Sequence, residues 1–143
     1  MEYTDSDGEK KRPVMLHRAI LGSVERFMSV LIEHYTGAFP VWLSPVQVAF
    51  LPVSTDKHLE GAKKLADEFK SAGIRVEVDG ADETVGNKIR KASKQKIPYI
   101  IVVGDKELGG EDLMIRVRGE EEQVSIGKEE FIERVKKEIL ERS

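Results

Sequence analysis

The stretch VQVAFLPV, residues 46–53, is a nearly continuous apolar run with the length of a single strand. Such a run is typical of a strand that is covered on both faces. The segment YIIVV, residues 99–103, has the same character and is the clearest buried strand in the chain. Two strands of this kind predict an α/β sheet with helices on both of its faces.

The segments that follow the first strand read as a helix, a strand and a second helix. Thr55 or Asp56 can cap the first helix, and Gly73 ends it. The apolar face of this helix consists of Leu59, Ala62, Leu65, Ala66 and Phe69. Residues 74–79, IRVEVD, alternate as a strand does. The second helix starts near Thr84 and turns Val85, Ile89 and Ala92 inward.

The C-terminal third adds a strand and a helix. The segment DKELGGED, residues 105–112, resembles a turn, and Leu113, Ile115 and Val117 then alternate with polar residues. A short strand near Val124 precedes a final helix over 128–142 that directs Phe131, Ile132, Val135 and Ile139 to the core. From Val46 onward the predicted order is β-α-β-α-β-β-α, with the first strands parallel.

The N-terminal part is organised differently. Residues 1–12 are polar and read as a loop, residues 13–16 as a short strand, and residues 22–35 as an amphipathic helix. The segment GAFPVWLSP, residues 37–45, carries two prolines and no charge, so it marks the main boundary. Because it is apolar, we expect a linker that packs onto the part that follows.

Composition excludes several classes of protein. The chain has 143 residues, enough for one good core, and no apolar run approaches the ~20 residues of a membrane span. Its N-terminus does not resemble a signal peptide. The absence of cysteine excludes disulfides, zinc fingers and thiol catalysis, and suits the cytoplasm. A net charge of −3 does not indicate a general nucleic-acid binder, so any basic surface must be local.

Signatures of enzymes are mostly absent from the sequence. It contains no phosphate-binding G-x-x-x-x-G-K-[ST] loop, no G-x-G-x-x-G and no G-x-S-x-G. His17, His34 and His58 have no spacing typical of metal ligands. A small-molecule-binding domain of the flavodoxin type is disfavoured, because no glycine-rich phosphate loop follows the first strand.

One local basic region stands out. Five basic residues and no acidic residue lie between positions 84 and 96: Lys88, Arg90, Lys91, Lys94 and Lys96. On a helix, Lys88 and Lys91 line one outer face, and Arg116 and Arg118 leave the same side of a later strand. A phosphate backbone with splayed bases would suit this arrangement. The alternative is a solvated charged face without a partner.

Four blocks in order carry a resemblance to a known family. HRAILGSVERF (17–27) resembles motif 3 of class II aminoacyl-tRNA synthetases, in the form found in threonyl-tRNA synthetases. FPVWLSPVQV (39–48), GIRVEVD (73–79) and VGNKIRKASKQKIPYIIVVGDKE (85–107) resemble the anticodon-binding domain of the same family. The resemblance implies a C-terminal fragment with three parts. Residues 1–36 would be a polar lead and the strand-helix end of the catalytic domain, 37–45 a linker, and 46–143 the anticodon-binding domain. The family's anticodon-binding fold is a mixed five-stranded sheet flanked by three helices.

The resemblance assigns an edge of the catalytic site to the N-terminal part. Arg26 would contact ATP, Gly22 would let the backbone lie close to the nucleotide, and Ser23 would sit beside the substrate pocket. His17 matches the third zinc ligand of the full-length enzyme, which ligates threonine to its tRNA with ATP, magnesium and zinc and is a homodimer. Motifs 1 and 2 and the other zinc ligands are absent from this chain, so we expect no cofactor, no tight zinc binding and no threonine activation by it alone.

The resemblance also assigns tRNA-contacting positions. Asp82 and Thr84 precede the basic helix, Lys96 follows it, and Glu107 and Arg116 lie beyond. The basic pattern of the helix, and not the resemblance, adds Lys88 and Lys91 as candidate phosphate contacts. Asp82, Thr84 and Lys96 depart from the residue types of many bacterial members, whereas Glu107 and Arg116 keep them. The implied partner is the anticodon loop of threonine tRNA, with no DNA and no membrane. The alternative is a free-standing paralogue of the domain that serves as an RNA or protein interaction module.

Overall fold

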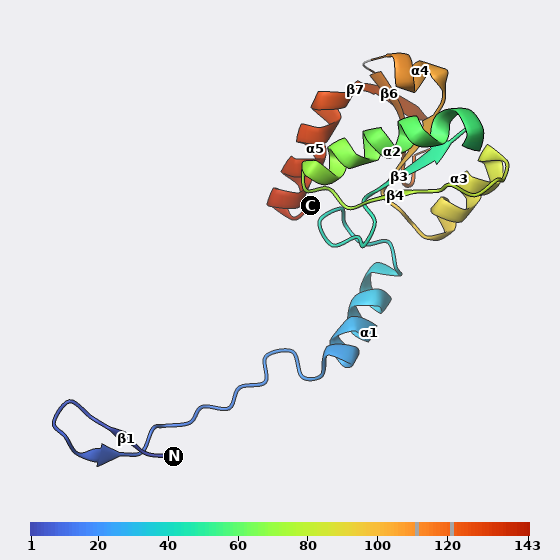
Figure 1. Ribbon diagram of the computed structural model, residues 1–143. Coiled ribbons are helices and arrows are strands. Elements are labelled where there is room, and N and C mark those ends of the chain that lie inside the picture. The colour runs from blue at the N-terminus through green and yellow to red at the C-terminus, as the bar shows by residue number, and fades with distance from the viewer. Residues whose placement is uncertain (111, 121) are drawn as a thin grey trace. The chain divides into compact units, whose positions relative to one another are not determined.

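The computed structural model describes residues 1–110, 112–120 and 122–143, and the chain divides into two compact units, Met1–Glu33 and His34–Ser143 (Figure 1). In the first unit, β1 (Tyr3–Thr4) pairs antiparallel with β2 (Lys10–Lys11). The Lys11 ammonium binds the carboxylates of Asp5 and Asp7 and so closes this hairpin. The predicted loop over residues 1–12 therefore contains a small hairpin.

The strand predicted over residues 13–16 does not form. Val14, Met15 and Leu16 are exposed, and no strand lies beside them to pair with their backbone. A β conformation needs such a neighbour, so apolar character alone was an insufficient signal. The helix predicted next is confirmed as α1, Val24–Tyr35.

The second unit is built on a five-stranded sheet with the order β4-β3-β5-β6-β7. Its strands are β3 (Val48–Pro52), β4 (Val76–Val78), β5 (Tyr99–Val103), β6 (Asp112–Val117) and β7 (Gln123–Gly127). β3 pairs parallel with both β4 and β5, whereas β6 and β7 continue the sheet antiparallel. The predicted mixed α/β sheet is confirmed.

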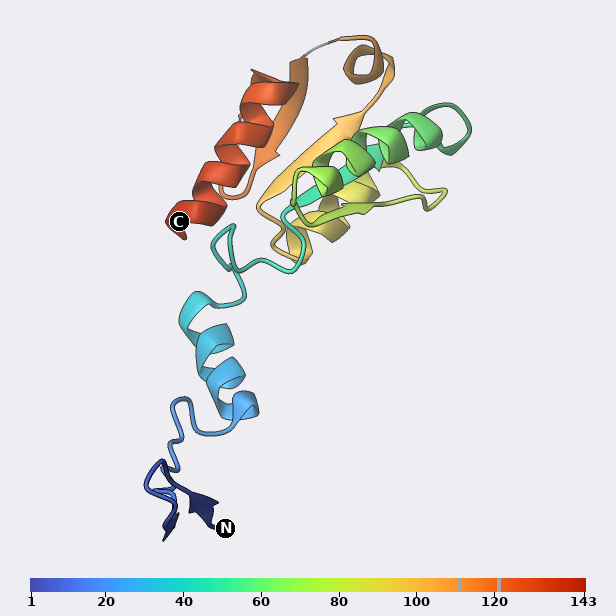
Figure 2. The same ribbon diagram turned by 60° about the vertical axis from the view of Figure 1, so that its left-hand side comes forward.

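Helices cover the two faces of this sheet unequally. α2 (Thr55–Ser71) and α5 (Lys128–Glu141) cover one face, and α3 (Val85–Lys94) covers part of the other. Successive side chains of a strand point to opposite faces. Phe50 of β3 accordingly joins Phe69 and Phe131 in the larger core, while Leu51 packs with Ala92 in the smaller one. Figure 2 shows α2 (green) and α3 (yellow) on opposite sides of β3.

Two local predictions need correction. The turn expected over residues 105–112 contains a short helix, α4 (Asp105–Gly109), which the glycine pair at its end, Gly109 and Gly110, had concealed. The first residue before α2 is Ser54, rather than Thr55 or Asp56. The Ser54 hydroxyl makes no capping hydrogen bond, and the backbone N–H of Ser54 donates to the Nδ1 atom of the buried His58 at 3.1 Å.

The segment between α1 and β3 belongs to the second unit and packs closely against the rest of it. Val41 and Ser44 are buried, and the carbonyls of Trp42 and Ser44 accept hydrogen bonds from the Arg75 guanidinium. The fully buried Gln47 bridges the Val41 carbonyl to the backbone N–H of Arg75. Among the described residues, no helix combines the length and the apolar character that crossing a membrane requires.

Candidate nucleic-acid interface

One face of the β6–β7 pair has no helix over it. Leu113 and Ile115 point into the core beneath α2 and α5, so the alternate residues of β6 point to the opposite side. On that side α3 packs against β3 and β5. The uncovered surface, which we term the open face, is formed by Asp112, Met114 and Arg116 of β6 and by Gln123 and Ser125 of β7.

Two depressions border the open face. One, of about 450 Å³, is lined by Lys106, Glu107, Gly110, Asp112, Met114 and Ser125. The other, of about 210 Å³, lies where Ile89 and Ser93 of α3 approach Arg116. Glu107 and Arg116, both predicted from the sequence, therefore lie at the two ends of one surface.

Glu107 is held in place by its own helix. Its Oε2 atom accepts a hydrogen bond from the backbone N–H of Gly104 at 3.0 Å, which caps the start of α4. The other carboxylate oxygen accepts no hydrogen bond within residues 1–110, 112–120 and 122–143. Glu107 thus combines a fixed position with one acceptor available to a ligand.

Arg116 has a partner that sequence reasoning did not identify. Gln123 lies directly opposite it on β7. With its amide oxygen turned toward Arg116, Gln123 accepts from Nη2 at 2.5 Å and from Nε at 3.3 Å. Only the pairing register of β6 and β7 reveals this contact. It orients the guanidinium, and the Nη1 atom makes no hydrogen bond within the described part of the chain.

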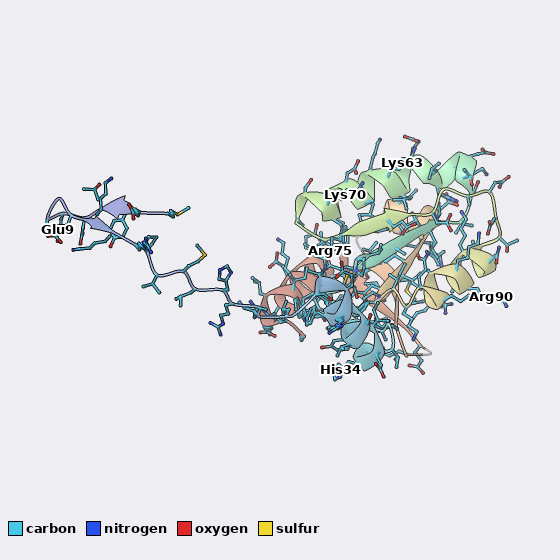
Figure 3. All side chains as sticks on the ribbon, turned by 90° about the horizontal axis from the view of Figure 1, so that it is seen from below. Glu9, His34, Lys63, Lys70, Arg75 and Arg90 are labelled. Carbon is cyan, nitrogen blue, oxygen red and sulfur yellow. The ribbon has the colours of Figure 1, made fainter. Side chains whose placement is uncertain are left out.

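The lysines of α3 do not form the single outer face that the sequence predicted. Lys88 is only 1% exposed, and its ammonium donates to the carbonyls of Pro52 (3.1 Å) and Asp79 (3.3 Å). The expectation that Lys88 faces outward is wrong, because it shares the inward face with Ala92, one turn later. Lys91 is exposed but forms an ion pair with Glu83 on the β4 side of α3. α3 therefore separates Lys91 from Arg116. Figure 3 shows Arg90 on the outer side of α3.

Asp82 and Thr84 lie in the exposed loop that connects β4 to α3. Thr84 occupies the position before the first residue of α3, and its carbonyl accepts from the backbone N–H groups of Asn87 and Lys88. Neither Asp82 nor the Thr84 hydroxyl has a hydrogen-bond partner among the described residues. Both side chains are open to a ligand.

Lys96 and Arg118 contact the segment that precedes β3. Lys96 has a left-handed backbone (φ 57°), and its ammonium donates to the Thr36 carbonyl. The Arg118 guanidinium donates to the carbonyls of Phe39 (2.8 Å) and Lys96 (2.7 Å), and partial burial lowers its pKa. Arg118 therefore holds backbone in place and does not lie free beside Arg116, as the sequence had suggested.

The remaining predicted residues belong to the first unit. The Ser23 hydroxyl accepts from the backbone N–H of Arg26 at 3.3 Å and so caps α1, while Gly22 has a φ of +67°. The side chain of Arg26 is exposed. His17 lies 3.0 Å from the sulfur of Met15, and no group of three or more His, Cys, Asp or Glu in the described residues could hold a metal ion.

Comparison with known proteins gives matches of three kinds. The family model described as "Anticodon binding domain" matches residues 47–138. The threonine–tRNA ligase of Rubrobacter xylanophilus is 49% identical over 142 residues, which is 99% of this chain and 22% of the ligase. That of Petrotoga mobilis is 50% identical over 143 residues, again covering 22% of the ligase. The chain thus spans about a fifth of the length of these relatives.

Solved structures agree with this result. The RNA binding domain of threonyl-tRNA synthetase from Cryptosporidium parvum Iowa II superposes with a TM-score of 0.76 at 34% identity, covering 95% of this chain and 34% of the other. A prolyl-tRNA synthetase from Cryptosporidium parvum gives a TM-score of 0.66 at 22% identity, covering 98% of this chain and 30% of the other, and shows a shared fold only. The matched family range begins at residue 47, so it gives no support for ATP binding by Gly22, Ser23 and Arg26.

Proposed function

Because this chain belongs to the anticodon-binding domain family and matches the C-terminal part of threonine–tRNA ligases, we propose that it binds the anticodon loop of threonine tRNA. The resemblance noted in the sequence is thereby confirmed at the level of the family. The proposal concerns what this domain recognises and which residues recognise it.

The open face of β6–β7 is the observation that carries the proposal. Unpaired anticodon bases expose their Watson–Crick edges, which proteins read by hydrogen bonds and by stacking. The unshared oxygen of Glu107 can accept from a base amino or imino group. The guanidinium of Arg116 is planar, so it can stack on a base or donate to its edge. Met114, 37% exposed between them, offers an apolar surface to a base.

Charge around this surface gives affinity without sequence preference. Lys106 borders the depression beside Glu107, while Arg90 and Lys94 are exposed on α3. Basic side chains of this kind neutralise phosphates and release counterions, so their contribution falls as salt rises. Asp82, Thr84, Lys91 and Lys96 are proposed as further tRNA contacts, with the Lys91–Glu83 and Lys96–Thr36 contacts exchanged for contacts to RNA. Lys88 is left out because its ammonium is buried.

The activity of the whole ligase is a second level of the proposal. There the chain would work in the cytoplasm as part of a homodimer that couples threonine to tRNA with ATP. His17 would complete a zinc site and Arg26 a nucleotide site with residues outside this chain. Anticodon binding is the share that we assign to the second unit, residues 34–143.

The test is fluorescence-anisotropy titration of an anticodon stem-loop of threonine tRNA. The control RNA has its second and third anticodon letters changed, and both are titrated at two salt concentrations. Arg116→Ala should weaken binding of the cognate loop by about 1–3 kcal/mol and reduce the preference for it. Lys91→Ala should weaken both loops alike and reduce the salt slope by about 1. Lys63→Ala, on the outer side of α2 (Figure 3), serves as the matched control.

The two outcomes separate the proposal from its alternative. A preference for the cognate loop at both salt concentrations supports an anticodon reader. Equal and steeply salt-dependent binding of both loops contradicts it and favours a free-standing interaction module. If Arg116→Ala lost affinity equally for both loops, only the specific role of Arg116 would be refuted, and the rest of the proposal would stand.

A further inference from the structure

The position of Glu107 depends on a helix too short to be stable by itself. α4 contains five residues, and isolated helices of that length do not persist in water. The direction of the Glu107 carboxylate is therefore set by whatever holds α4 against the rest of the domain. α4 lies against β5, β6 and α2, and two side-chain contacts from the first half of α2 reach it.

The first contact is made by His58, which is 5% exposed. Its Nδ1 atom accepts the backbone N–H of Ser54 at 3.1 Å, so the proton of the neutral ring lies on Nε2. Nε2 lies 3.1 Å from the Oδ1 atom of Asp105, the first residue of α4, and donates to it. The imidazole thus links the start of α2 to the start of α4.

The second contact is made by Gly61, one turn further along α2. A methyl group at this position would lie 2.6 Å from both terminal carbons of Leu108. Only glycine allows the Leu108 side chain to lie this close to α2. Leu108 directly follows Glu107, so its approach to Gly61 is a contact between α2 and the part of α4 that carries Glu107.

We propose that His58 and Gly61 are positioning residues that hold Glu107 at the distance and angle needed to read an anticodon base. This inference rests on the proposed function. Neither residue lines the two depressions that border the open face; Gly61 lines a separate depression of about 300 Å³, together with Glu107 and Leu108. A methyl group at Gly61 would lie 2.6 Å from the terminal carbons of Leu108, so the Leu108 side chain must shift until these carbons lie at least 3.4 Å from it, which disturbs its packing against α2. A hydrogen bond weakens over a displacement of that size, whereas contacts to phosphates by flexible lysines adapt to it.

The quantity to measure is discrimination, the ratio of the dissociation constants for the altered and the cognate stem-loops, with the full chain. Gly61→Ala should reduce discrimination at least about five-fold and change the affinity for the altered loop less than about two-fold. Adding Leu108→Ala removes the clash and should restore discrimination. Glu60→Gln, an exposed neighbour on the same turn, should behave as the wild type. Circular dichroism of each variant checks that it folds.

Two further comparisons test whether the effect passes through α4. In a Glu107→Ala background, Gly61→Ala should cause no additional loss of discrimination. His58→Gln keeps a donor near the Nε2 position and should retain more discrimination than His58→Asn, whose amide lies at the Nδ1 position and cannot reach Asp105. The Gly104 amide, which Glu107 caps, should exchange faster with solvent in Gly61→Ala and recover in the double variant.

Different failures point to different errors. The positioning role is overturned if Gly61→Ala keeps wild-type discrimination, lowers both affinities equally, or still reduces discrimination when Glu107 is absent. It is also overturned if His58→Asn retains as much discrimination as His58→Gln. A wild-type chain that does not distinguish the two loops overturns the proposed function and this inference with it.

Discussion

Gln47 gives the sharpest test of how this domain is held together. Its side chain is completely buried at the point where the chain enters β3. The amide nitrogen donates to the Val41 carbonyl at 2.8 Å, and the amide oxygen accepts the backbone N–H of Arg75 at 2.9 Å. One side chain therefore satisfies two backbone groups, one 6 residues away in the sequence and the other 28 residues away.

Replacing Gln47 by methionine isolates this contribution. Methionine has nearly the same volume, so the cavity term is small. The Val41 carbonyl and the Arg75 N–H lose their partner, and each unsatisfied buried group costs about 1–3 kcal/mol. Because the Arg75 N–H is only partly buried, we place the total loss at about 2–4 kcal/mol. This is a large share of the ~5–15 kcal/mol that stabilises a typical domain.

Urea unfolding followed by tryptophan fluorescence measures the effect, since Trp42 is the only tryptophan and follows Val41 directly. With a slope of about 2 kcal/mol per molar urea, the midpoint should fall by about 1–2 M while the slope is unchanged. Gln95→Met is the matched control, because Gln95 is exposed on the surface; it should stay within about 0.5 kcal/mol of wild type. A loss below about 1 kcal/mol for Gln47→Met would refute the reasoning.

Three other predictions follow from buried groups. Phe131 is 1% exposed and lies between two aromatic rings, so Phe131→Ala should lower the free energy of unfolding by about 3–5 kcal/mol. The control Leu140→Ala, at an exposed position on the same helix, should lower it by less than about 0.5 kcal/mol; thermal unfolding measures both. Lys88→Ala removes a buried ammonium and leaves the carbonyls of Pro52 and Asp79 without this donor, so the free energy of unfolding, measured in urea, should fall by about 2–3 kcal/mol. The control Lys94→Ala, at an exposed position of α3, should cause no measurable loss. Burial and the hydrogen bond to Glu138 raise the pKa of Tyr99 above its ordinary value of 10, so the folded state keeps the phenolic proton longer than the unfolded state and stability should fall as pH rises past 10. In Tyr99→Phe that part of the alkaline fall should be absent, and equal slopes in the two proteins would contradict the assignment.

The elements of the second unit were predictable because their signals are local. The run VQVAFLPV has no polar residue except Gln47, so a strand buried on both faces was the natural interpretation. α2 and α5 show clear apolar stripes. α4 was missed because a five-residue helix has too few turns for periodicity. The strand predicted over residues 13–16 was wrong because a strand needs a neighbouring strand to pair with, and the segment's own sequence does not show whether one is present.

The candidate site was predictable only in part, for a related reason. Glu107 and Arg116 were identified from resemblance, and the structure brings them to one surface. Lys88 was assigned to the wrong face, because the apolar stripe of α3 is short and its centre is poorly defined. Gln123 and the role of Arg118 depend on pairing and contacts between distant segments. No pattern within a window of residues carries that information.

The open face follows from the numbers of helices and strands on the two sides of the sheet. The parallel crossovers place α2 on one side of β3 and α3 on the other, and α5 returns to the side of α2. Two helices thus cover one face of five strands, while one helix covers the other. Because β6 and β7 extend the sheet beyond α3, their residues on that side meet water; Asp112, Arg116, Gln123 and Ser125 are polar, and Met114 is 37% exposed among them. The same surface carries the Arg116 guanidinium and is bordered by Lys106, and such groups suit the stacking, hydrogen bonding and phosphate contacts that the proposed binding of unpaired bases would use.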